Sequence, residues 1–189
     1  LEQYVNKVGI GDKLNLDDDY LVVLVHPETE NIGVNATNVD LLLNAINVVK
    51  IPVVILWPNL DLDTSEVTGV LRRYRENSSA IKKRFIKNLE ADFFLQLIKQ
   101  SKCLVGNSSA GLREAGFLGV PVVNIGGRQR GRDRGENVID VSWRQADIAQ
   151  AIKSQFARKY KKQMIYGDGN ASKKIINKII ELKPTIRKD

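Results

Sequence analysis

Residues 103–116 read CLVGNSSAGLREAG: a short apolar run, then small polar residues, then a helical pattern. The apolar run predicts the end of a buried strand, and residues 109–118 are predicted to be helical. At such a junction the free backbone N–H groups and the positive end of the helix dipole favour a phosphate. Glu114 lies further into the helix, where its carboxylate can accept hydrogen bonds from ribose hydroxyls. The stretch therefore predicts a nucleotide site with Ser108 and Ser109 at the phosphate. An ordinary serine cap beside a solvated glutamate is the alternative.

An arginine-rich segment follows the next predicted strand, residues 120–124. Four arginines lie there within seven residues, at positions 128, 130, 132 and 134, interleaved with glycine. A guanidinium group pairs bidentately with phosphate, and glycine lets the backbone come close to a ligand. We expect Arg128 to contact a pyrophosphate because it comes first after the strand. Of Arg130 and Arg132, one is expected to bind and the other to brace the loop. A solvated run of charges is the alternative.

The rest of the chain alternates apolar strands with helical patterns, and no internal repeat interrupts this order. The alternation predicts an α/β fold with a doubly wound parallel sheet of the Rossmann-like class. Ligands of such sheets bind beyond the carboxyl ends of the strands. Because His26, Asn59, Ser108 and Arg128 each follow a predicted strand, we expect one composite site. The predicted strands are 21–25, 52–57, 83–86, 102–105, 120–124 and 137–141, and the predicted helices are 38–49, 64–76, 92–100, 109–118, 145–156 and 171–182.

Composition narrows the class of protein. A chain of 189 residues that is 43% hydrophobic and 27% charged is typical of one globular domain. A single cysteine, Cys103, excludes an internal disulfide. With only one cysteine and one histidine in the chain, a zinc site is disfavoured. No apolar run approaches the ~20 residues that cross a bilayer. We therefore expect a cytoplasmic protein without a metal, a cofactor or a membrane segment.

The formal net charge of +7 raises nucleic acid as a partner. The positive residues fall in the arginine-rich segment and along the C-terminal third of the chain. Aromatic residues make up 6% of the chain, and none is interleaved with the arginines as a base-stacking platform requires. Nucleic acid is therefore disfavoured, although a non-catalytic nucleotide- or RNA-binding basic domain remains an alternative.

Several segments together resemble the UDP-N-acetylglucosamine 2-epimerase family, and most of all its hydrolysing branch. The stretches GNSSAGLRE (106–114), GVPVVNIG (119–126), RQRGR (128–132) and GENV (135–138) carry the resemblance. Further matches follow the family order from about residue 20 to residue 180, namely LVHPET (24–29), WPNLD (57–61) and YGDGNA (166–171). The non-hydrolysing branch typically has Asp-Ser-Gly-Gly where this chain has NSSA, residues 107–110.

The resemblance implies the C-terminal half of a glycosyltransferase-B-like fold. Family members have two domains, and the first domain carries the acidic residues of the acid–base chemistry. We therefore expect residues 1–189 to be a single UDP-binding C-terminal domain, with the N-terminal catalytic domain absent from this chain. A homo-oligomer is a possible assembly. The implied reaction converts UDP-N-acetylglucosamine and water into N-acetylmannosamine and UDP, by anti-elimination and hydration. The fragment alone is expected to be inactive. A UDP-sugar glycosyltransferase of the same fold is an alternative.

The resemblance also implies roles for individual residues, each beside a structural alternative. Ser108 and Ser109 are expected to hold the β-phosphate and Glu114 the ribose. His26 is expected to be catalytic, acting on the leaving phosphate. The other expected UDP contacts are Asn59 at a phosphate, Leu89 at the uracil, and Arg128 and Arg132 at the pyrophosphate. Residues 88–90 read NLE where the family often has His-Val-Pro, so the base contact departs from the family pattern.

Overall fold

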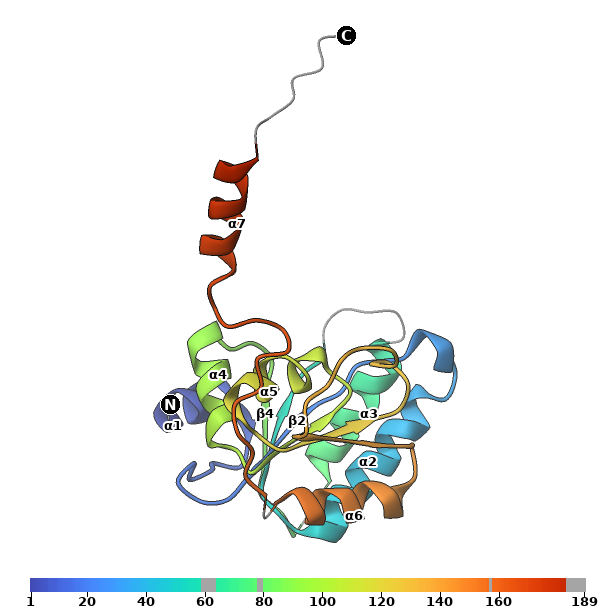
Figure 1. Cartoon of the computed structure of the whole chain (residues 1–189). Coiled ribbons are helices and arrows are strands. Elements are labelled where there is room, and N and C mark those ends of the chain that lie inside the picture. Colours follow the sequence, from blue (N-terminus) through green and yellow to red (C-terminus); the bar gives the residue numbers. More distant parts are fainter. Residues whose placement is uncertain (59–63, 78–79, 157, 183–189) are drawn as a thin grey trace.

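A parallel β-sheet forms the centre of the molecule (Figure 1). The computed structural model describes residues 1–58, 64–77, 80–156 and 158–182. The sheet has seven strands in the order β1-β4-β3-β2-β5-β6-β7. Six are parallel to one another: β2 (Leu21–Leu24), β3 (Val53–Leu56), β4 (Lys83–Ile86), β5 (Cys103–Gly106), β6 (Val122–Ile125) and β7 (Val138–Val141).

The order of the parallel strands reverses between β2 and β5. The chain builds outward from β2 through β3 to β4, then returns to the other side of β2 and builds outward through β5, β6 and β7. Leu24, at the end of β2, pairs with Leu56 of β3 and with Gly106 of β5. The carboxyl ends of these strands are therefore level, and a ligand site is expected in the crevice where the order reverses. This confirms the predicted doubly wound sheet.

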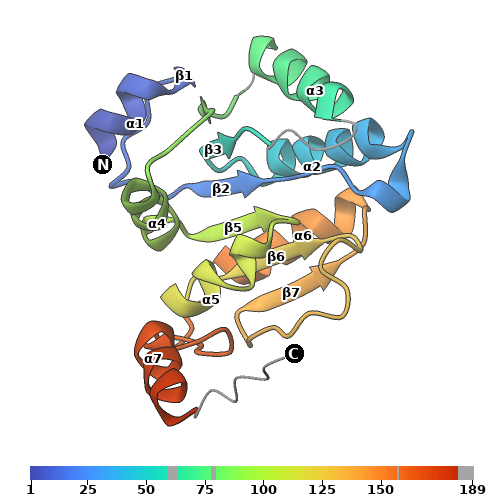
Figure 2. The same cartoon turned by 90° about the horizontal axis from the view of Figure 1, so that it is seen from above.

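Helices cover both faces of the sheet, which explains why the central strands β2 and β3 are continuous apolar runs. Two separate buried clusters result, one on each face. Val23 belongs to the first and its neighbour Val22 to the second, because successive side chains of a strand point to opposite faces. Figure 2 shows the two helical layers. The first contains α2 (Asn35–Val49), α3 (Thr64–Glu76) and α6 (Gln145–Phe156), and the second contains α1 (Glu2–Val8), α4 (Ala91–Gln100) and α5 (Glu114–Leu118).

Several features differ from the predictions, and α1 and the 3₁₀ turn η1 (Thr29–Asn31) were not predicted at all. Residues 109–118 do not form one helix: a 3₁₀ turn, η2 (Ser109–Gly111), precedes the short α5. Gly111 is pressed against the sheet, since a Cβ there would lie 2.9 Å from a methyl of Val122. The unpredicted β1 (Ile10–Gly11) pairs antiparallel with β4. It is held by the buried Arg84, whose guanidinium donates to the Gly11 carbonyl at 2.7 Å.

The last described helix, α7 (Ala171–Glu181), stands away from the body of the molecule (Figure 1). Its predicted apolar side is present, but Ile176 is 56% exposed and Ile180 is 76% exposed. The preceding turn is ordered by Asp168, which accepts hydrogen bonds from the Asn170 backbone N–H and the Lys174 ammonium group. These bonds, the one from the Asn170 backbone first, lower the pKa of Asp168 to about 2.

Gly106 closes β5 at the reversal point and tests this geometry. Its φ is +143°, and a Cβ there would lie 2.1 Å from the Leu24 carbonyl oxygen. Gly33 also has a positive φ, +83°, but nothing lies within 4 Å of its Cβ position. We expect Gly33→Ala to cost about 1 kcal/mol of unfolding free energy and Gly106→Ala about 3 kcal/mol or more, measured by urea unfolding. Equal losses would contradict the close approach of β5 to β2.

Candidate nucleotide site

Two neighbouring cavities open at the carboxyl edge of the sheet, and Ser109 lines both. The aromatic cavity, of about 310 Å³, is lined by Leu24, His26, Leu56, Trp57, Lys87, Asn88, Leu89, Phe94, Ser108, Ser109, Ala110 and Glu114. The arginine cavity, of about 800 Å³, is lined by Pro27, Glu28, Thr29, Glu30, Ser109 and residues 127–132. One continuous ligand could therefore pass over Ser109, with one part in each cavity.

The structure brings seven of the eight expected site residues to these two cavities. The aromatic cavity holds His26, Leu89, Ser108, Ser109 and Glu114. The arginine cavity holds Arg128 and Arg132, together with Ser109. The eighth residue, Asn59, lies outside the described residues. Residues distant in the sequence thus meet where the strand ends predict, while their contacts with a ligand remain predictions.

The serine turn after β5 is tight and partly buried. Ser108 is buried, and its hydroxyl oxygen accepts a hydrogen bond from the Ala110 backbone N–H at 3.3 Å. Ser109 is half-buried between the two cavities. Glu114 is the first residue of α5, and its half-buried side chain lines the aromatic cavity. A hydroxyl group at the junction and a carboxylate on one wall match the chemistry of a phosphate followed by a ribose.

Asn107 fixes the two central strand ends to each other. Its side-chain oxygen accepts a hydrogen bond from the His26 backbone N–H at 2.8 Å, and its side-chain nitrogen donates to the His26 carbonyl at 2.9 Å. The Asn107 carbonyl in turn accepts a hydrogen bond from the buried Gln129 amide at 2.7 Å. Neither Asn107 nor Gln129 was predicted as a site residue. Asn107 has a local signal, a polar residue directly after an apolar strand, whereas Gln129 lies inside the arginine loop after β6.

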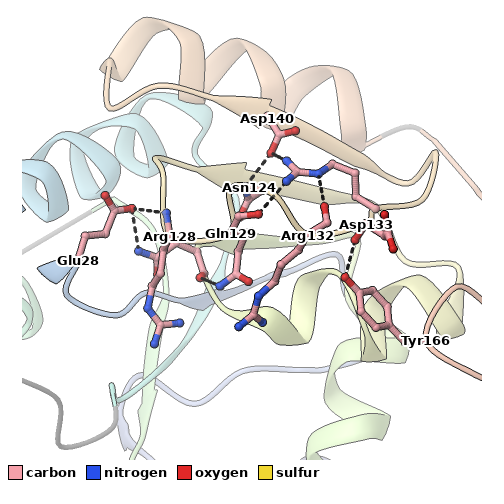
Figure 3. Close-up of polar contacts among 10 residues, drawn as sticks. Glu28, Asn124, Arg128, Gln129, Arg132, Asp133, Asp140 and Tyr166 are labelled. Carbon is pink, nitrogen blue, oxygen red and sulfur yellow. Dashed lines mark hydrogen bonds and ion pairs between the residues drawn. The ribbon is translucent and has the colours of Figure 1, made fainter. Parts of the chain in front are cut away.

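The arginine loop, residues 127–134, separates its arginines into two groups (Figure 3). Arg134 turns back into the loop, where its guanidinium donates to the carbonyls of Gln129 at 2.8 Å and Arg132 at 3.2 Å. It also forms an ion pair with Asp140 of β7. The exposed side chains of Arg128 and Arg132 point to the other side of the loop, away from Asp140. Arg134 thus braces the loop, with Asp140 as its ionic partner.

Other chemistries find less support among the described residues. Burial raises the pKa of the Cys103 thiol, so this side chain stays protonated inside the sheet and is a poor nucleophile. No group of three or more His, Cys, Asp or Glu side chains in the described ranges could hold a metal ion. Within the same ranges, no helix has the length and apolar character to cross a bilayer.

Comparison with known proteins identifies the family and the fold of the chain. A family model described as UDP-N-acetylglucosamine 2-epimerase matches residues 1–180. The chain belongs to this family. A solved structure of the Neisseria meningitidis UDP-GlcNAc 2-epimerase bound to UDP-GlcNAc is similar, with a TM-score of 0.69 at 20% identity, over 89% of this chain and 46% of that chain. The glycosyltransferase-B-like α/β fold expected from the sequence is therefore confirmed.

Two relatives of known name are similar in sequence. The GDP/UDP-N,N'-diacetylbacillosamine 2-epimerase (hydrolyzing) of Campylobacter jejuni is 29% identical over 150 residues, which cover 79% of this chain and 38% of that protein. The polysialic acid biosynthesis protein P7 of Escherichia coli is 35% identical over 133 residues, which cover 70% of this chain and 34% of that protein. The chain therefore spans well under half the length of these relatives.

The Glu114 carboxylate gives a test of the ribose assignment. We expect Glu114→Gln to weaken UDP binding by roughly 1.5–3 kcal/mol, because amidation removes charge-assisted hydrogen bonds to the ribose hydroxyls. Pyrophosphate lacks a ribose, and its affinity should stay unchanged. Calorimetric titration of both ligands makes the comparison, and equal losses would assign Glu114 to bracing α5.

Arg128 and Arg134 give a test of the two arginine groups. We expect Arg128→Ala to cost about 1–3 kcal/mol more UDP affinity than Arg134→Ala, because Arg128 lines the arginine cavity and Arg134 does not. Arg134→Ala should cost more stability, about 1 kcal/mol in urea unfolding, because it leaves the carbonyls of Gln129 and Arg132 without this donor and removes the ion pair with Asp140. Similar affinity losses that vanish at high salt would instead indicate a diffuse basic patch.

Proposed function

We propose that the chain is the UDP-binding C-terminal domain of a hydrolysing UDP-N-acetylglucosamine 2-epimerase. The observation that carries the proposal is the place of Ser109 between a cavity with Glu114 and a cavity with arginines. A nucleoside diphosphate has the same order of groups, with the base and ribose at one end and two phosphates at the other. The hydrolysing activity is supported by the name of the Campylobacter jejuni relative.

In this proposal the uridine occupies the aromatic cavity. Trp57 and Phe94 are half-buried on its wall and offer apolar surface to a base, and Leu89 lies at the same wall. Glu114 accepts hydrogen bonds from the ribose diol. The diphosphate then crosses the serine turn, where Ser108 and Ser109 bind the β-phosphate. Arg128 and Arg132 lie beyond it, at the place where the charge of a departing UDP increases.

The reaction of the whole enzyme divides between two halves. A base removes the proton at C2 of the sugar while the C1–O bond to UDP breaks, which gives 2-acetamidoglucal and UDP. Water then adds across the double bond with inversion at C2 and gives N-acetylmannosamine. The residues of this chain neutralise the charge that grows on the leaving pyrophosphate, which is the part of the barrier that arginines lower.

His26 has the position of a group that acts on the leaving phosphate. Its side chain is 6% exposed and lines the aromatic cavity close to the serine turn, and Asn107 fixes its backbone. A protonated imidazole can donate a proton to a phosphate oxygen as the C1–O bond breaks. We therefore assign it the catalytic role within this domain, and the base for C2 to the other half.

Two further observations support the proposal that the whole enzyme has a second domain. The chain covers 38% of the Campylobacter jejuni relative, so that protein has room for a second domain. Exposed apolar side chains lie in the loop after β2, at Ile32 and Val34, and along α7. We propose that residues 1–189 form one domain, and that these apolar residues contact an N-terminal catalytic domain which this chain does not include. The name of the Escherichia coli relative supports a role in making sialic-type sugars, and a cytoplasmic location stays a prediction.

The proposal predicts binding without turnover. We expect the chain to bind UDP more tightly than ADP or a short RNA, and to release no UDP from UDP-N-acetylglucosamine. Calorimetry measures the binding, and a coupled assay for UDP measures the reaction, with the chain joined to an N-terminal half from a relative as the positive control. Turnover by the chain alone would contradict the division of labour. Tighter binding of RNA than of UDP would contradict the proposed function.

A further inference from the structure

The Glu28 side chain lies where three loops meet at the carboxyl edge of the sheet. It follows β2 and is 4% exposed. Its Oε1 atom accepts a hydrogen bond from the side-chain amide of Asn107, after β5, at 3.4 Å. The same atom accepts a hydrogen bond from the backbone N–H of Arg128, after β6, at 3.3 Å (Figure 3). One buried carboxylate therefore connects the segments that follow three strands.

The backbone of Glu28 is fixed as firmly as its side chain. Its N–H donates to the Asn35 side-chain oxygen at 2.9 Å, and its carbonyl accepts from the Asn35 side-chain nitrogen at 3.1 Å. Asn35 is the buried first residue of α2. Asn107 binds the backbone of His26 by the same pair of bonds. The carboxylate is thus held in place by α2 on one side and by β5 on the other.

Gly126, the residue before the arginine loop, lies directly against the Glu28 carboxylate. A Cβ there would lie 2.3 Å from Glu28 Oε1 and 2.3 Å from Trp143 Nε1, and the φ of Gly126 is +77°. Only glycine allows this approach. Two residues later the Arg128 N–H points inward to Glu28, while the Arg128 side chain lines the arginine cavity. The residue that donates to Glu28 through its backbone is therefore the same residue that lines the arginine cavity with its side chain.

We propose that Glu28 is a positioning residue for phosphate recognition, which orients Arg128 by accepting the hydrogen bond of its backbone N–H. The inference rests on the proposed binding of UDP and adds a residue to it. A charged acceptor makes a stronger bond to an N–H than a neutral one. A fixed negative charge beneath the loop also offsets the repulsion among three exposed arginines before a phosphate arrives. Glu28 also lines the arginine cavity, and the role proposed for it is the one that it exerts through Arg128.

The test compares Glu28→Met, which removes the acceptor at similar volume, with Glu28→Gln, which keeps a neutral one. Hydrogen exchange of the full chain without ligand reports the Arg128 amide directly, with the amides of β5 as the internal reference. We expect the exchange rate of the Arg128 amide to rise about tenfold or more in Glu28→Met. In Glu28→Gln the rate should lie close to that of the wild type. Gly126→Ala should also raise it, because the added methyl separates the loop from the carboxylate. Glu136→Met removes a charge from an exposed position near the loop and should leave exchange unchanged.

Ligand affinities separate positioning from a merely structural role. Pyrophosphate affinity should fall about tenfold in Glu28→Met, while uridine, which has no phosphate, should bind as to the wild type. Unchanged exchange at Arg128 in Glu28→Met, or equal losses for pyrophosphate and uridine, would overturn the inference. A wild-type chain that binds neither UDP nor pyrophosphate would instead overturn the proposed function, and the phosphate part of this inference with it.

Discussion

The carboxyl edge of the sheet depends on the side-chain amide of Asn107. Its oxygen and nitrogen bind both polar groups of the His26 backbone, and its backbone N–H donates to the Leu24 carbonyl at 3.3 Å. The same residue contacts Glu28 and Gln129, so the loops after β2 and after β6 are both hydrogen-bonded to this fully buried asparagine. A buried polar group without a partner costs about 1–3 kcal/mol, and both polar atoms of the Asn107 side chain have one. The strand-order reversal makes the crevice, and Asn107 holds its two sides at a fixed separation.

This constraint explains why four arginines in one loop differ in role. Glu28 holds the loop near its start through the Arg128 N–H, and Asp140 holds its end through the Arg134 guanidinium. Gln129 fastens the middle to the Asn107 carbonyl. A loop fixed at three points loses little conformational freedom when a ligand binds, so less of the interaction energy is used in ordering it. The exposed arginines then differ from Arg134 because their charges face outward.

The sequence predicted the parts of the structure that local patterns encode. Strands buried on both faces are continuous apolar runs, and the rule that ligands bind beyond strand ends placed His26, Ser108 and Arg128 together. Residues 109–118 were predicted as one helix, whereas Gly111 ends η2 against Val122, and β1 is only two residues long. Glu28 was also missed, because its hydrogen bond to Arg128 spans 100 residues of sequence. The ion pair between Arg134 and Asp140 was missed as well, because it joins the loop to the strand β7.

The C-terminal segment shows how the site depends on more than its own residues. Fully burying an isoleucine side chain is worth roughly 1.5–3 kcal/mol. The four isoleucines of α7 are largely exposed, so a surface that covers α7 would gain most of this stabilisation. The segment before α7 also touches the arginine loop, since the Tyr166 hydroxyl donates to the Asp133 carbonyl at 2.6 Å (Figure 3). Asp168 joins that segment to Lys174 of α7. In the proposed two-domain enzyme, a surface that covers α7 therefore acts on a segment already hydrogen-bonded to the loop that holds the pyrophosphate.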